Sequence, residues 1–267
     1  MKPRPITVGD IEVTPISDGI GKLPPQYFLN ADWTAHQALL GPDGMVAIPI
    51  GAFIIHTGDQ TILVDTGLGT YSNPLFETGD LPDQLTAAGT DPADVDLVVL
   101  THLHMDHCGW LVRDEAPFFP NATVRFGAAD WDHFVTGHEG PENVRQDFRI
   151  LEEADRLKPV SSDGEAVAPG VTTRMAPGHT PGHQCLIVSS GADRLILLGD
   201  AVTCPVQIEE PDWQAISDVD AALAQRTREA LWLELEGTND MAVAAHFPDL
   251  QFGRVLAGQG KRDFGPA

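Results

Sequence analysis

The sequence predicts a mixed α/β protein. Short apolar runs bounded by turn-forming residues recur along the chain, as is typical of buried β-strands. Between these runs lie longer stretches in which apolar residues recur with helical spacing. Hydrophobic residues make up 42% of the 267 positions, which is enough for a large core. No Pro-, Gly- or Ser-rich linker divides the sequence, so we expect one domain over residues 1–267.

Apolar runs predict the strands. Residues 52–55 and 61–64 are separated by the letters HTGDQ, whose Gly-Asp pair indicates a hairpin turn. The run LVVL at 97–100 contains no polar residue, so we expect a strand buried on both faces. Further strands are predicted at residues 123–126, 185–188 and 195–198.

Three stretches are predicted to form helices. The first covers residues 81–88 and precedes Gly89, a residue type common directly after a helix C-terminus. The second covers residues 141–157, with a proline in the first turn and one apolar face. The third begins at the letters SDVD (217–220), which resemble a capping box, and runs to Leu235.

Charge and cysteine content exclude several classes of function. The 16 Lys and Arg against 39 Asp and Glu give a net charge of -23, which repels phosphate backbones and anionic lipid. We therefore expect neither nucleic acid nor a membrane as partner. Three scattered cysteines are too few for a disulfide framework. The N-terminus lacks an apolar signal segment and no apolar run could span a bilayer, so we expect a cytoplasmic protein.

The letters THLHMDHCG (101–109) place three histidines and an aspartate within six positions. Such a cluster is costly to bury unless a bound cation satisfies it. His102 and His104 follow the apolar run and, two positions apart in extended chain, point to the same side. Asp106 and His107 follow in a loop and can turn toward a second point nearby. The spacing therefore predicts ligands for two metal ions.

Two metal sites need about three further ligands. The letters APGHTPGH offer His179 or His183, and spacing does not choose between them. Asp200 ends the run LLGD, and His246 follows the apolar residues 241–245. Each of these polar residues follows an apolar segment, as ligands at one edge of a sheet require.

Taken in order, THLHMDH, APGHTPGH, LLGD and AHF make the sequence similar to the metallo-β-lactamase superfamily over residues 51–246. The resemblance implies an αββα sandwich, in which two mixed β-sheets are flanked by helices and the site lies at one edge between the sheets. It also implies two similar halves, which suits the likeness of ILVDTG (62–67) to ILLGDA (196–201).

The resemblance assigns a role to each candidate residue. Carried over by motif, the metal ligands are His102, His104 and His179 for the first ion, Asp106, His107 and His246 for the second, and Asp200 as the bridge. Asp65 would orient ligands by hydrogen bonds without touching a metal. The expected cofactors are two divalent ions, with zinc first and Mn, Fe or Co as alternatives.

Two such ions predict a hydrolase. A hydroxide that bridges them is a strong nucleophile near neutral pH, since one Zn²⁺ alone can lower the pKa of its water to about 7. We expect this hydroxide to attack a lactone or an ester that is small, uncharged and apolar. Asp106 is the expected catalytic residue, because it could also accept and return the proton.

Within the superfamily, the sequence is most similar to the lactonase and methyl parathion hydrolase branch. Members of that branch carry a long segment before the first motif, like residues 1–50 here, which we expect to contribute to the pocket or to a homodimer. Asp200 argues against a true β-lactamase, and the acidic surface argues against a nuclease. Alternatives are a phosphotriesterase on the same site, a non-enzymatic metal-binding module and an oxygen-using iron enzyme.

Two details concern the substrate. Many lactonases that quench quorum sensing carry a tyrosine three positions after the bridging aspartate, where this chain has Thr203. This departure argues against specificity for acyl-homoserine lactones, but not against lactone or aryl-ester hydrolysis. Trp110, directly after the metal loop, is the aromatic residue that we most expect in the pocket. The wider aromatic candidates are Tyr27, Phe28, Trp33, Phe118, Phe119, Trp131 and Phe134.

Overall fold

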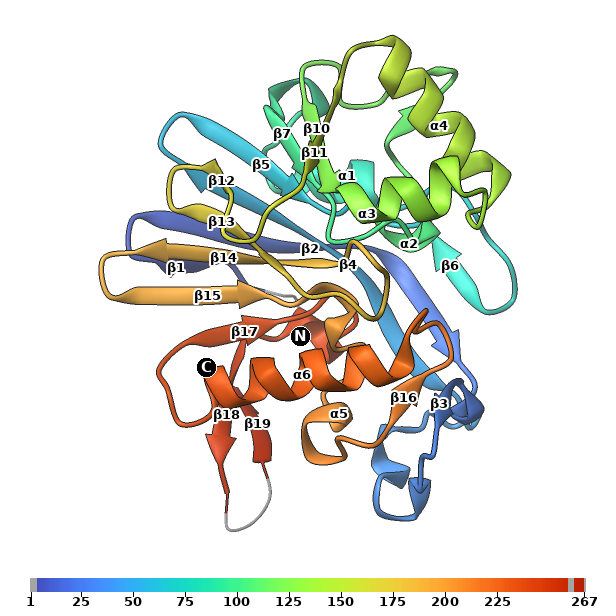
Figure 1. The fold of residues 1–267 in the computed structure, drawn as a ribbon, viewed down its shortest axis with the longest axis vertical. Coiled ribbons are helices and arrows are strands. Elements are labelled where there is room, and N and C mark those ends of the chain that lie inside the picture. Colours follow the sequence, from blue (N-terminus) through green and yellow to red (C-terminus); the bar gives the residue numbers. More distant parts are fainter. Residues whose placement is uncertain (1–3, 259–261, 267) are drawn as a thin grey trace.

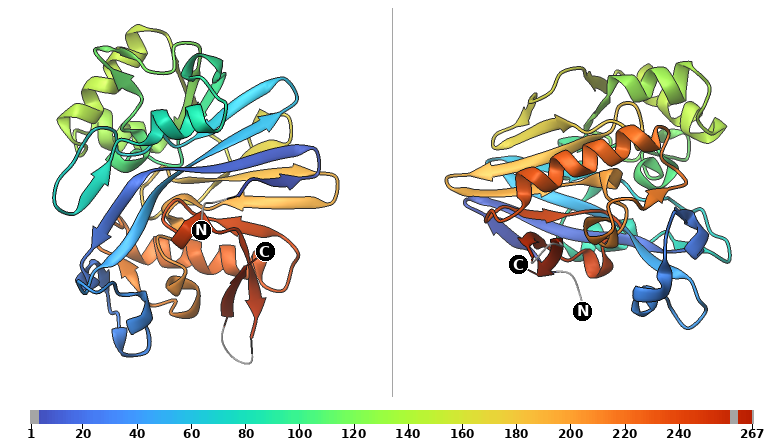
Figure 2. Two further views of the ribbon diagram at one scale, coloured as in Figure 1. Left: turned by 180° about the vertical axis from the view of Figure 1, so that it is seen from behind. Right: turned by 60° about the horizontal axis from the view of Figure 1, so that its bottom comes forward.

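Two mixed β-sheets lie face to face, and helices cover the outer face of each (Figure 1, Figure 2). The structure is a computed structural model that describes residues 4–258 and 262–266. Its layers form the αββα sandwich that the resemblance implies. None of the helices in the described part of the chain has the length and apolarity needed to cross a bilayer.

The first sheet is built from the N-terminal half. Its strand order is β1-β2-β4-β5-β7-β10-β11, and β6 pairs with β2. Long antiparallel strands β2 and β4 make up one side, whereas β5, β7, β10 and β11 run parallel to one another. The strands are β1 (Ile6–Val8), β2 (Ile11–Leu23), β4 (Val46–Thr57), β5 (Gln60–Val64), β6 (Phe76–Thr78), β7 (Leu97–Val99), β10 (Thr123–Gly127) and β11 (Leu157–Val160).

The second sheet is built from the C-terminal half, in the order β12-β13-β14-β15-β17-β18-β19. Among the described strands of this sheet, β15 and β17 pair in parallel and the other pairs are antiparallel. The strands are β12 (Ala166–Ala168), β13 (Val171–Met175), β14 (Gln184–Ser190), β15 (Asp193–Leu197), β17 (Met241–Val243), β18 (Gly253–Ala257) and β19 (Arg262–Pro266). Two short pairs lie outside the sheets, β3 (Phe28–Leu29) with β16 (Gln214–Ala215) and β8 (Val112–Arg113) with β9 (Ala116–Pro117).

Helices are short except for two. Helix α4 packs on the first sheet, and α6 packs on the second (Figure 1). The α-helices are α1 (Leu81–Ala87), α2 (Met105–Cys108), α3 (Ala128–Asp130), α4 (Glu142–Glu153), α5 (Val206–Glu209) and α6 (Ala221–Leu235). A π-helical turn covers Trp131–Thr136, and single 3₁₀ turns cover Pro25–Tyr27, Trp33–Ala35, Gln37–Leu39, Pro92–Asp94, Gly199–Ala201 and Pro248–Leu250.

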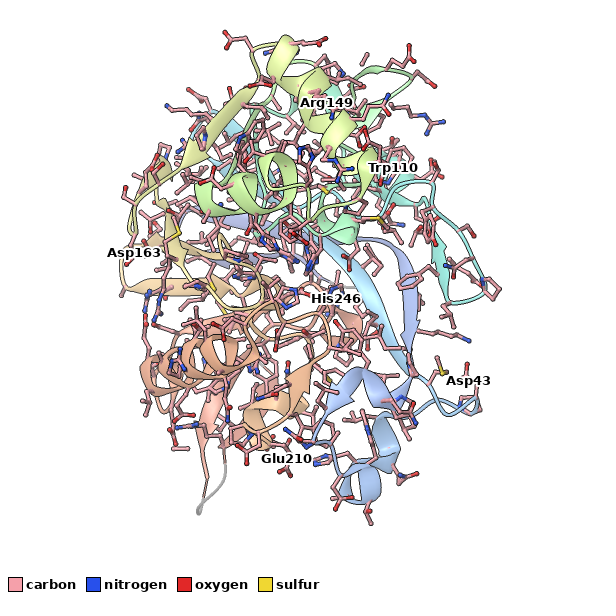
Figure 3. The ribbon with its side chains drawn as sticks, turned by 45° about the vertical axis from the view of Figure 1, so that its right-hand side comes forward. Asp43, Trp110, Arg149, Asp163, Glu210 and His246 are labelled. Atoms are coloured by element: carbon pink, nitrogen blue, oxygen red, sulfur yellow. The ribbon has the colours of Figure 1, made fainter. Side chains whose placement is uncertain are left out.

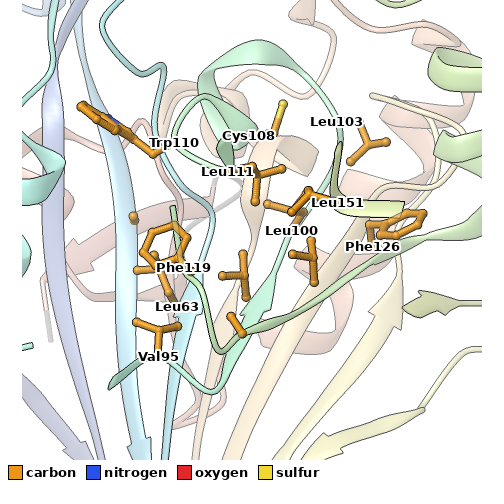
Figure 4. Close-up of a cluster of buried hydrophobic side chains, with 14 of the residues drawn as sticks. Leu63, Val95, Leu100, Leu103, Cys108, Trp110, Leu111, Phe119, Phe126 and Leu151 are labelled. Carbon is orange, nitrogen blue, oxygen red and sulfur yellow. The ribbon is translucent and has the colours of Figure 1, made fainter. Parts of the chain in front are cut away.

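Apolar side chains fill the layers of the sandwich. Phe53 of the first sheet and Leu186 of the second belong to the cluster between the sheets. A second cluster, which includes Leu63 and Leu151, fills the space between the first sheet and its helices (Figure 4). On the other side, Trp232 of α6 is fully buried against the second sheet. Each sheet is therefore packed on both of its faces, against the other sheet on one face and against helices on the other.

The two halves repeat one arrangement. In the first, the β4–β5 hairpin is followed by β7, which runs parallel to β5. In the second, the β14–β15 hairpin is followed by β17, which runs parallel to β15. Asp65 follows β5, and Asp200 lies three residues after β15. The sequence likeness between 62–67 and 196–201 thus marks equivalent strand ends.

Two helix boundaries differ from the prediction. The predicted helix over 141–157 ends at Glu153, because Asp155 adopts a left-handed φ of 55° and Leu157 begins β11. The third helix is capped by Asp220, whose side chain accepts a hydrogen bond from the Leu223 N–H. The predicted capping box at 217–220 is therefore wrong, since the cap is its last residue. The six predicted strands are confirmed.

Candidate metal centre

The sequence-predicted ligands meet where strands of both sheets end. His102 and His104 lie beyond β7, His179 lies between β13 and β14, and Asp200 and His246 follow β15 and β17. Figure 3 shows His246 near the centre of the molecule, between the two halves of the sandwich. Parallel strands of both sheets therefore deliver polar side chains to one edge.

Three histidines form the first cluster. The Nδ1 atom of His104 lies 3.0 Å from Nε2 of His102 and 3.0 Å from Nε2 of His179. Two nitrogens that share a tetrahedral Zn²⁺ at about 2.0–2.1 Å lie about 3.3 Å apart, so this spacing suits one ion. Burial lowers the pKa of His102 well below its usual range and that of His104 to about 3. Both rings are thus neutral near pH 7, as metal ligation requires.

Asp106, His107 and His246 form the second cluster. The Asp106 Oδ2 atom lies 3.4 Å from His246 Nε2 and 3.8 Å from His107 Nε2. The side chain of Asp106 is 26% exposed, whereas both histidines are buried. This cluster therefore reaches the surface of the cavity through its carboxylate.

Asp200 connects the two clusters. Its Oδ2 lies 3.5 Å from Nε2 of His179, in the first cluster. Its Oδ1 lies 3.4 Å from His107 Nε2 and 3.3 Å from His246 Nε2, in the second. Burial by itself raises the pKa of Asp200, but His246 and His107 lower it well below its usual range. One ionised carboxylate thus faces both groups of nitrogen ligands.

Two buried atoms at this junction lack a partner. His107 Nε2 and Asp200 Oδ1 have no hydrogen bond to any described residue, although each is buried. An unsatisfied buried polar atom costs about 1–3 kcal/mol, and more when charged. Burial lowers the pKa of His246, but the Asp200 charge raises it to about 10, so without a metal the ring holds a proton. A cation between the clusters would replace the proton of His246. It would also give a partner to His107 Nε2 and Asp200 Oδ1, so the residues fit divalent metal ions.

Buried carboxylates orient the ligand rings. Asp65 Oδ2 lies 2.8 Å from Nδ1 of His107, the orienting contact that the sequence predicts. Asp218 Oδ1 lies 2.9 Å from Nδ1 of His179, and its other oxygen lies 3.4 Å from the Arg228 guanidinium. Each carboxylate fixes the tautomer in which Nε2 is free to bind a metal. Sequence reasoning missed Asp218, whose only signal is its place in SDVD.

His179 and His183 have different surroundings in the structure. Nε2 of His183 accepts hydrogen bonds from the backbone N–H groups of Asp200 and Ala201, at 2.9 Å and 3.1 Å. His183 therefore supports the turn that carries Asp200, and only His179 joins the first cluster.

Asp130 joins the two loops that carry the first cluster. Its Oδ2 accepts hydrogen bonds from the Leu103 N–H and the Thr180 hydroxyl, at 3.2 Å and 2.8 Å. Its Oδ1 accepts from the Gly182 N–H at 2.6 Å. Burial raises the pKa of Asp130 to about 6. This buried carboxylate was also missed, because nothing in its local sequence marks it.

Residues 49–238 match the Metallo-beta-lactamase superfamily. The chain belongs to this superfamily. Among curated relatives, the N-acyl homoserine lactonase AttM of Rhizobium radiobacter is 36% identical over 178 residues, 57% of this chain and 64% of the relative. The N-acyl homoserine lactonase of Bacillus cereus is 27% identical over 184 residues, 62% of this chain and 69% of the relative. The chain thus matches about two thirds of the length of these superfamily members.

Solved structures of superfamily members share the fold over the whole chain. The hydrolase AbOPH has a TM-score of 0.88 at 24% identity, with 100% of this chain and 98% of that chain covered. The quorum-quenching lactonase AidC, described as a dizinc enzyme, has a TM-score of 0.87 at 22% identity, with 100% and 97% covered. The predicted metallo-β-lactamase sandwich is therefore confirmed.

In this superfamily member the ligand clusters open into a cavity of about 330 Å³. His104, Asp106, Asp200 and His246 line its polar end. The apolar wall comes largely from the N-terminal half, and its members are Leu23, Ile48, Leu68, Phe76 and Met105. Such a cavity, apolar with a few polar groups, suits a small uncharged ligand.

The prediction that Trp110 lines the pocket is wrong. Trp110 is 3% exposed, and its Nε1 donates a hydrogen bond of 2.8 Å to Asp18 Oδ1. The N–H groups of Gly109 and Trp110 bond to the carbonyls of Gly67 and Thr66, which directs the chain away from the metal loop and into the core. Tyr27, another of the aromatic candidates, lines the cavity instead.

Proposed function

We propose that this protein is a dinuclear metal-dependent hydrolase that opens a lactone or cleaves a comparable ester. The observation that carries the proposal is Asp200, whose two oxygens face two separate clusters of histidine nitrogens. The relatives named N-acyl homoserine lactonase support a lactone as the substrate class and do not favour the phosphotriesterase alternative. Seven candidate ligands, two of them carboxylates, argue against a closed four-coordinate structural site.

The proposed ligands are those predicted from the sequence: His102, His104 and His179 for one ion, Asp106, His107 and His246 for the other, and Asp200 for both. Zinc is the proposed metal, because the structurally similar AidC is described as a dizinc lactonase. When bound, the two ions supply Lewis acidity, which activates water and polarises the scissile carbonyl group.

Asp106 is the proposed proton carrier. Of the two proposed ligand carboxylates that line the cavity, Asp106 is the more exposed, with 26% of its side chain accessible against 6% for Asp200, so its oxygens can contact an attacking water. Burial alone raises the pKa of Asp106, but the charges of His107 and His246 lower it below its usual range. The carboxylate is therefore ionised at neutral pH and able to accept a proton, which it can return to the leaving oxygen.

The cavity suits an uncharged, partly apolar substrate. Its apolar wall accepts an acyl or alkyl group. Two bound divalent ions would outweigh the charges of Asp106 and Asp200, so the polar end of the loaded site would be positive. It would therefore attract the carbonyl oxygen of a neutral lactone or ester.

Proton release on N-hexanoyl-homoserine lactone and on an alkyl γ-lactone tests the proposal. We expect turnover by zinc-loaded protein, loss of turnover after chelation, and a fall in kcat of about 100-fold or more in Asp106→Asn. The same preparations should hydrolyse an aryl phosphotriester more slowly. If the loaded protein released no protons while chelation unfolded it, the non-enzymatic metal-binding module would be the better description.

Three further features are kept as proposals: a single domain, a homodimer and a cytoplasmic location. We propose one domain over residues 1–267, supported by the pairing of β2 with β4, which builds the N-terminal extension into the first sheet. Homodimerisation is to be measured by light scattering, and the cytoplasmic location by fractionation of cells.

A further inference from the structure

Hydroxyl groups form a second polar feature of the cavity. Tyr27, Thr203 and Ser217 all line it together with Asp106 and Asp200. Thr203 is 1% exposed, and its Oγ1 has no hydrogen-bond partner among the described residues. A buried hydroxyl without a hydrogen-bond partner lowers the stability of the fold. A hydrogen bond to a ligand oxygen in the cavity would offset this loss.

Tyr27 supplies a further donor to the same cavity. Its Oη lies 2.5 Å from the Oγ of Ser217, so one hydroxyl of this pair donates to the other. Each hydroxyl carries a single proton, so the pair always keeps one O–H for another acceptor. Together with Thr203, the cavity therefore offers two unused O–H donors.

The backbone holds Tyr27 in place. Its carbonyl accepts a 2.9 Å hydrogen bond from the Ile216 N–H, next to the β3–β16 pair. The Trp33 indole donates to the Pro25 carbonyl at 3.1 Å, which fixes the turn that carries Tyr27. The ring of Trp33 packs on Trp213, with centroids 4.8 Å apart. The hydroxyl is thus positioned before any ligand binds, as an effective catalytic donor requires.

We propose that Ser217 donates to Tyr27 Oη, and that the free O–H groups of Tyr27 and Thr203 form a neutral donor site for the carbonyl oxygen of the ester group that is cleaved. This inference rests on the proposed hydrolysis of a lactone or ester. Both donors line the cavity with Asp106 and Asp200, where the reacting group must lie. The carbonyl oxygen gains negative charge during attack, so the two O–H groups bind it more strongly in the transition state than in the substrate.

Two observations support neutral donors in this position. Burial raises the pKa of Tyr27, and the charge of Asp200 raises it further, so the phenol keeps its proton. Thr203 lies three residues after Asp200, and its buried Oγ1 has no hydrogen-bond partner among the described residues. Tyr27 reaches the same cavity from the N-terminal extension, so two segments share the task.

Kinetics of zinc-loaded, full-length variants test the inference. Tyr27→Phe and Thr203→Val each remove one hydroxyl with little change in shape, and Thr203→Ser restores it. Loss of one preorganised oxyanion donor lowers kcat by about 100–1000-fold, and bound metal ions would share that stabilisation here, so we expect about 10–100-fold for each donor. KM should change by less than about threefold, because the donors act on the transition state.

Thr86→Val is the matched control. Thr86 is exposed on α1, does not line the cavity, and its hydroxyl donates a 3.0 Å hydrogen bond to the Pro82 carbonyl. This variant should keep the kcat of the unchanged protein. Zinc content and the thermal unfolding midpoint are measured for every variant, and lost zinc in Tyr27→Phe or Thr203→Val would indicate a structural role and overturn the inference.

Two substrates separate the remaining outcomes. N-hexanoyl-homoserine lactone carries a second carbonyl in its amide, whereas an alkyl γ-lactone carries only the ring ester. A fall in kcat on both substrates supports the inference. A rise in KM confined to the amide-bearing lactone would overturn it, because the hydroxyls would then bind the side chain. Unchanged kinetics in the variants would overturn the inference alone, whereas no turnover by the unchanged protein would overturn the proposed function as well.

Discussion

At the scale of single residues, the site depends on carboxylates that touch no substrate. The Asp218 side chain is fully buried between His179 and Arg228. The Arg228 guanidinium lies 3.4 Å from one carboxylate oxygen, and the other oxygen accepts the Nδ1–H of His179, which favours the tautomer with Nε2 free. Asp218 and Arg228 together therefore orient His179 so that its Nε2 is free to bind a metal ion.

Asp218→Asn should weaken binding of the first metal ion. The amide can present its NH₂ group to Nδ1 and favour the wrong tautomer, so we expect zinc affinity to fall by about 10–100-fold. Titration against a competing chelator measures the loss. Asp212→Asn is the control, because Asp212 is exposed and contacts the Gln225 amide on the surface. Equal zinc affinity in both variants would contradict the role of Asp218.

Asp130 should make the stability of the metal-free protein depend on pH. Its pKa is raised by burial to about 6 in the folded state, against about 3.9 in an unfolded chain. The folded protein therefore binds more protons than the unfolded chain between these values, and stability falls as pH rises. We expect the unfolding free energy, relative to Asp130→Asn, to decrease by up to about 3 kcal/mol from pH 4 to 6.5. Urea titrations at both pH values check this, and an increase would contradict it.

At the scale of elements, close backbone contacts hold the ligand loops. Gly127 ends β10 with ordinary extended backbone, and a Cβ there would lie 1.9 Å from the Gly182 carbonyl oxygen. Gly182 belongs to the loop that carries His179 and donates its N–H to Asp130. The end of β10 thus determines how close this loop lies to the metal loop.

Gly127→Ala should displace the loop that carries His179. We expect a loss of stability of about 1–3 kcal/mol, typical of overpacking, together with weaker zinc binding. Gly164→Ala provides the comparison, because its φ of 71° is strained for alanine but no atom lies within 4 Å of the added carbon. That variant should lose about 1 kcal/mol and keep its zinc affinity. Normal zinc binding by Gly127→Ala would contradict this account.

At the scale of the whole molecule, the metal ligands come from both sheets. His102, His104, Asp106 and His107 follow β7 of the first sheet. The remaining candidates, His179, Asp200 and His246, come from the second. Bound ions would therefore connect the halves of the sandwich at one edge, beyond the apolar packing that joins the sheets elsewhere.

Removing the ions should loosen this edge. A ligand present at about 1000 times its dissociation constant stabilises a fold by about 4 kcal/mol, so chelation should lower the midpoint of thermal unfolding. Hydrogen exchange should speed up in residues 101–109 and 176–183, and stay unchanged in the β2–β4 pair. Added zinc should reverse both effects. Uniformly faster exchange over the chain would instead indicate that the whole fold depends on the metal.

Local sequence patterns predict many of the strands and the short segment that contains most of the candidate ligands. The six apolar runs became strands because each contains the residues that a buried strand requires. The metal-loop residues are recognisable since His102 to His107 lie within one short segment and their spacing needs no tertiary contact. Their role as ligands stays a prediction, although the structure brings their nitrogen and oxygen atoms together.

The positions of the other site residues depend on tertiary packing. The choice of His179 over His183 depends on which ring meets the N–H groups of Asp200 and Ala201. Trp110 is buried because backbone hydrogen bonds join residues 109–110 to residues 66–67. Tyr27 is placed by the hydrogen bond from the Ile216 N–H to its carbonyl, beside the β3–β16 pair and almost 190 residues away in the chain. The sequence by itself determined the strands and the chemical types at their ends. Only the tertiary structure decided which side chains face the cavity. The direction of a side chain depends on contacts between distant segments, and no local sequence pattern encodes these contacts.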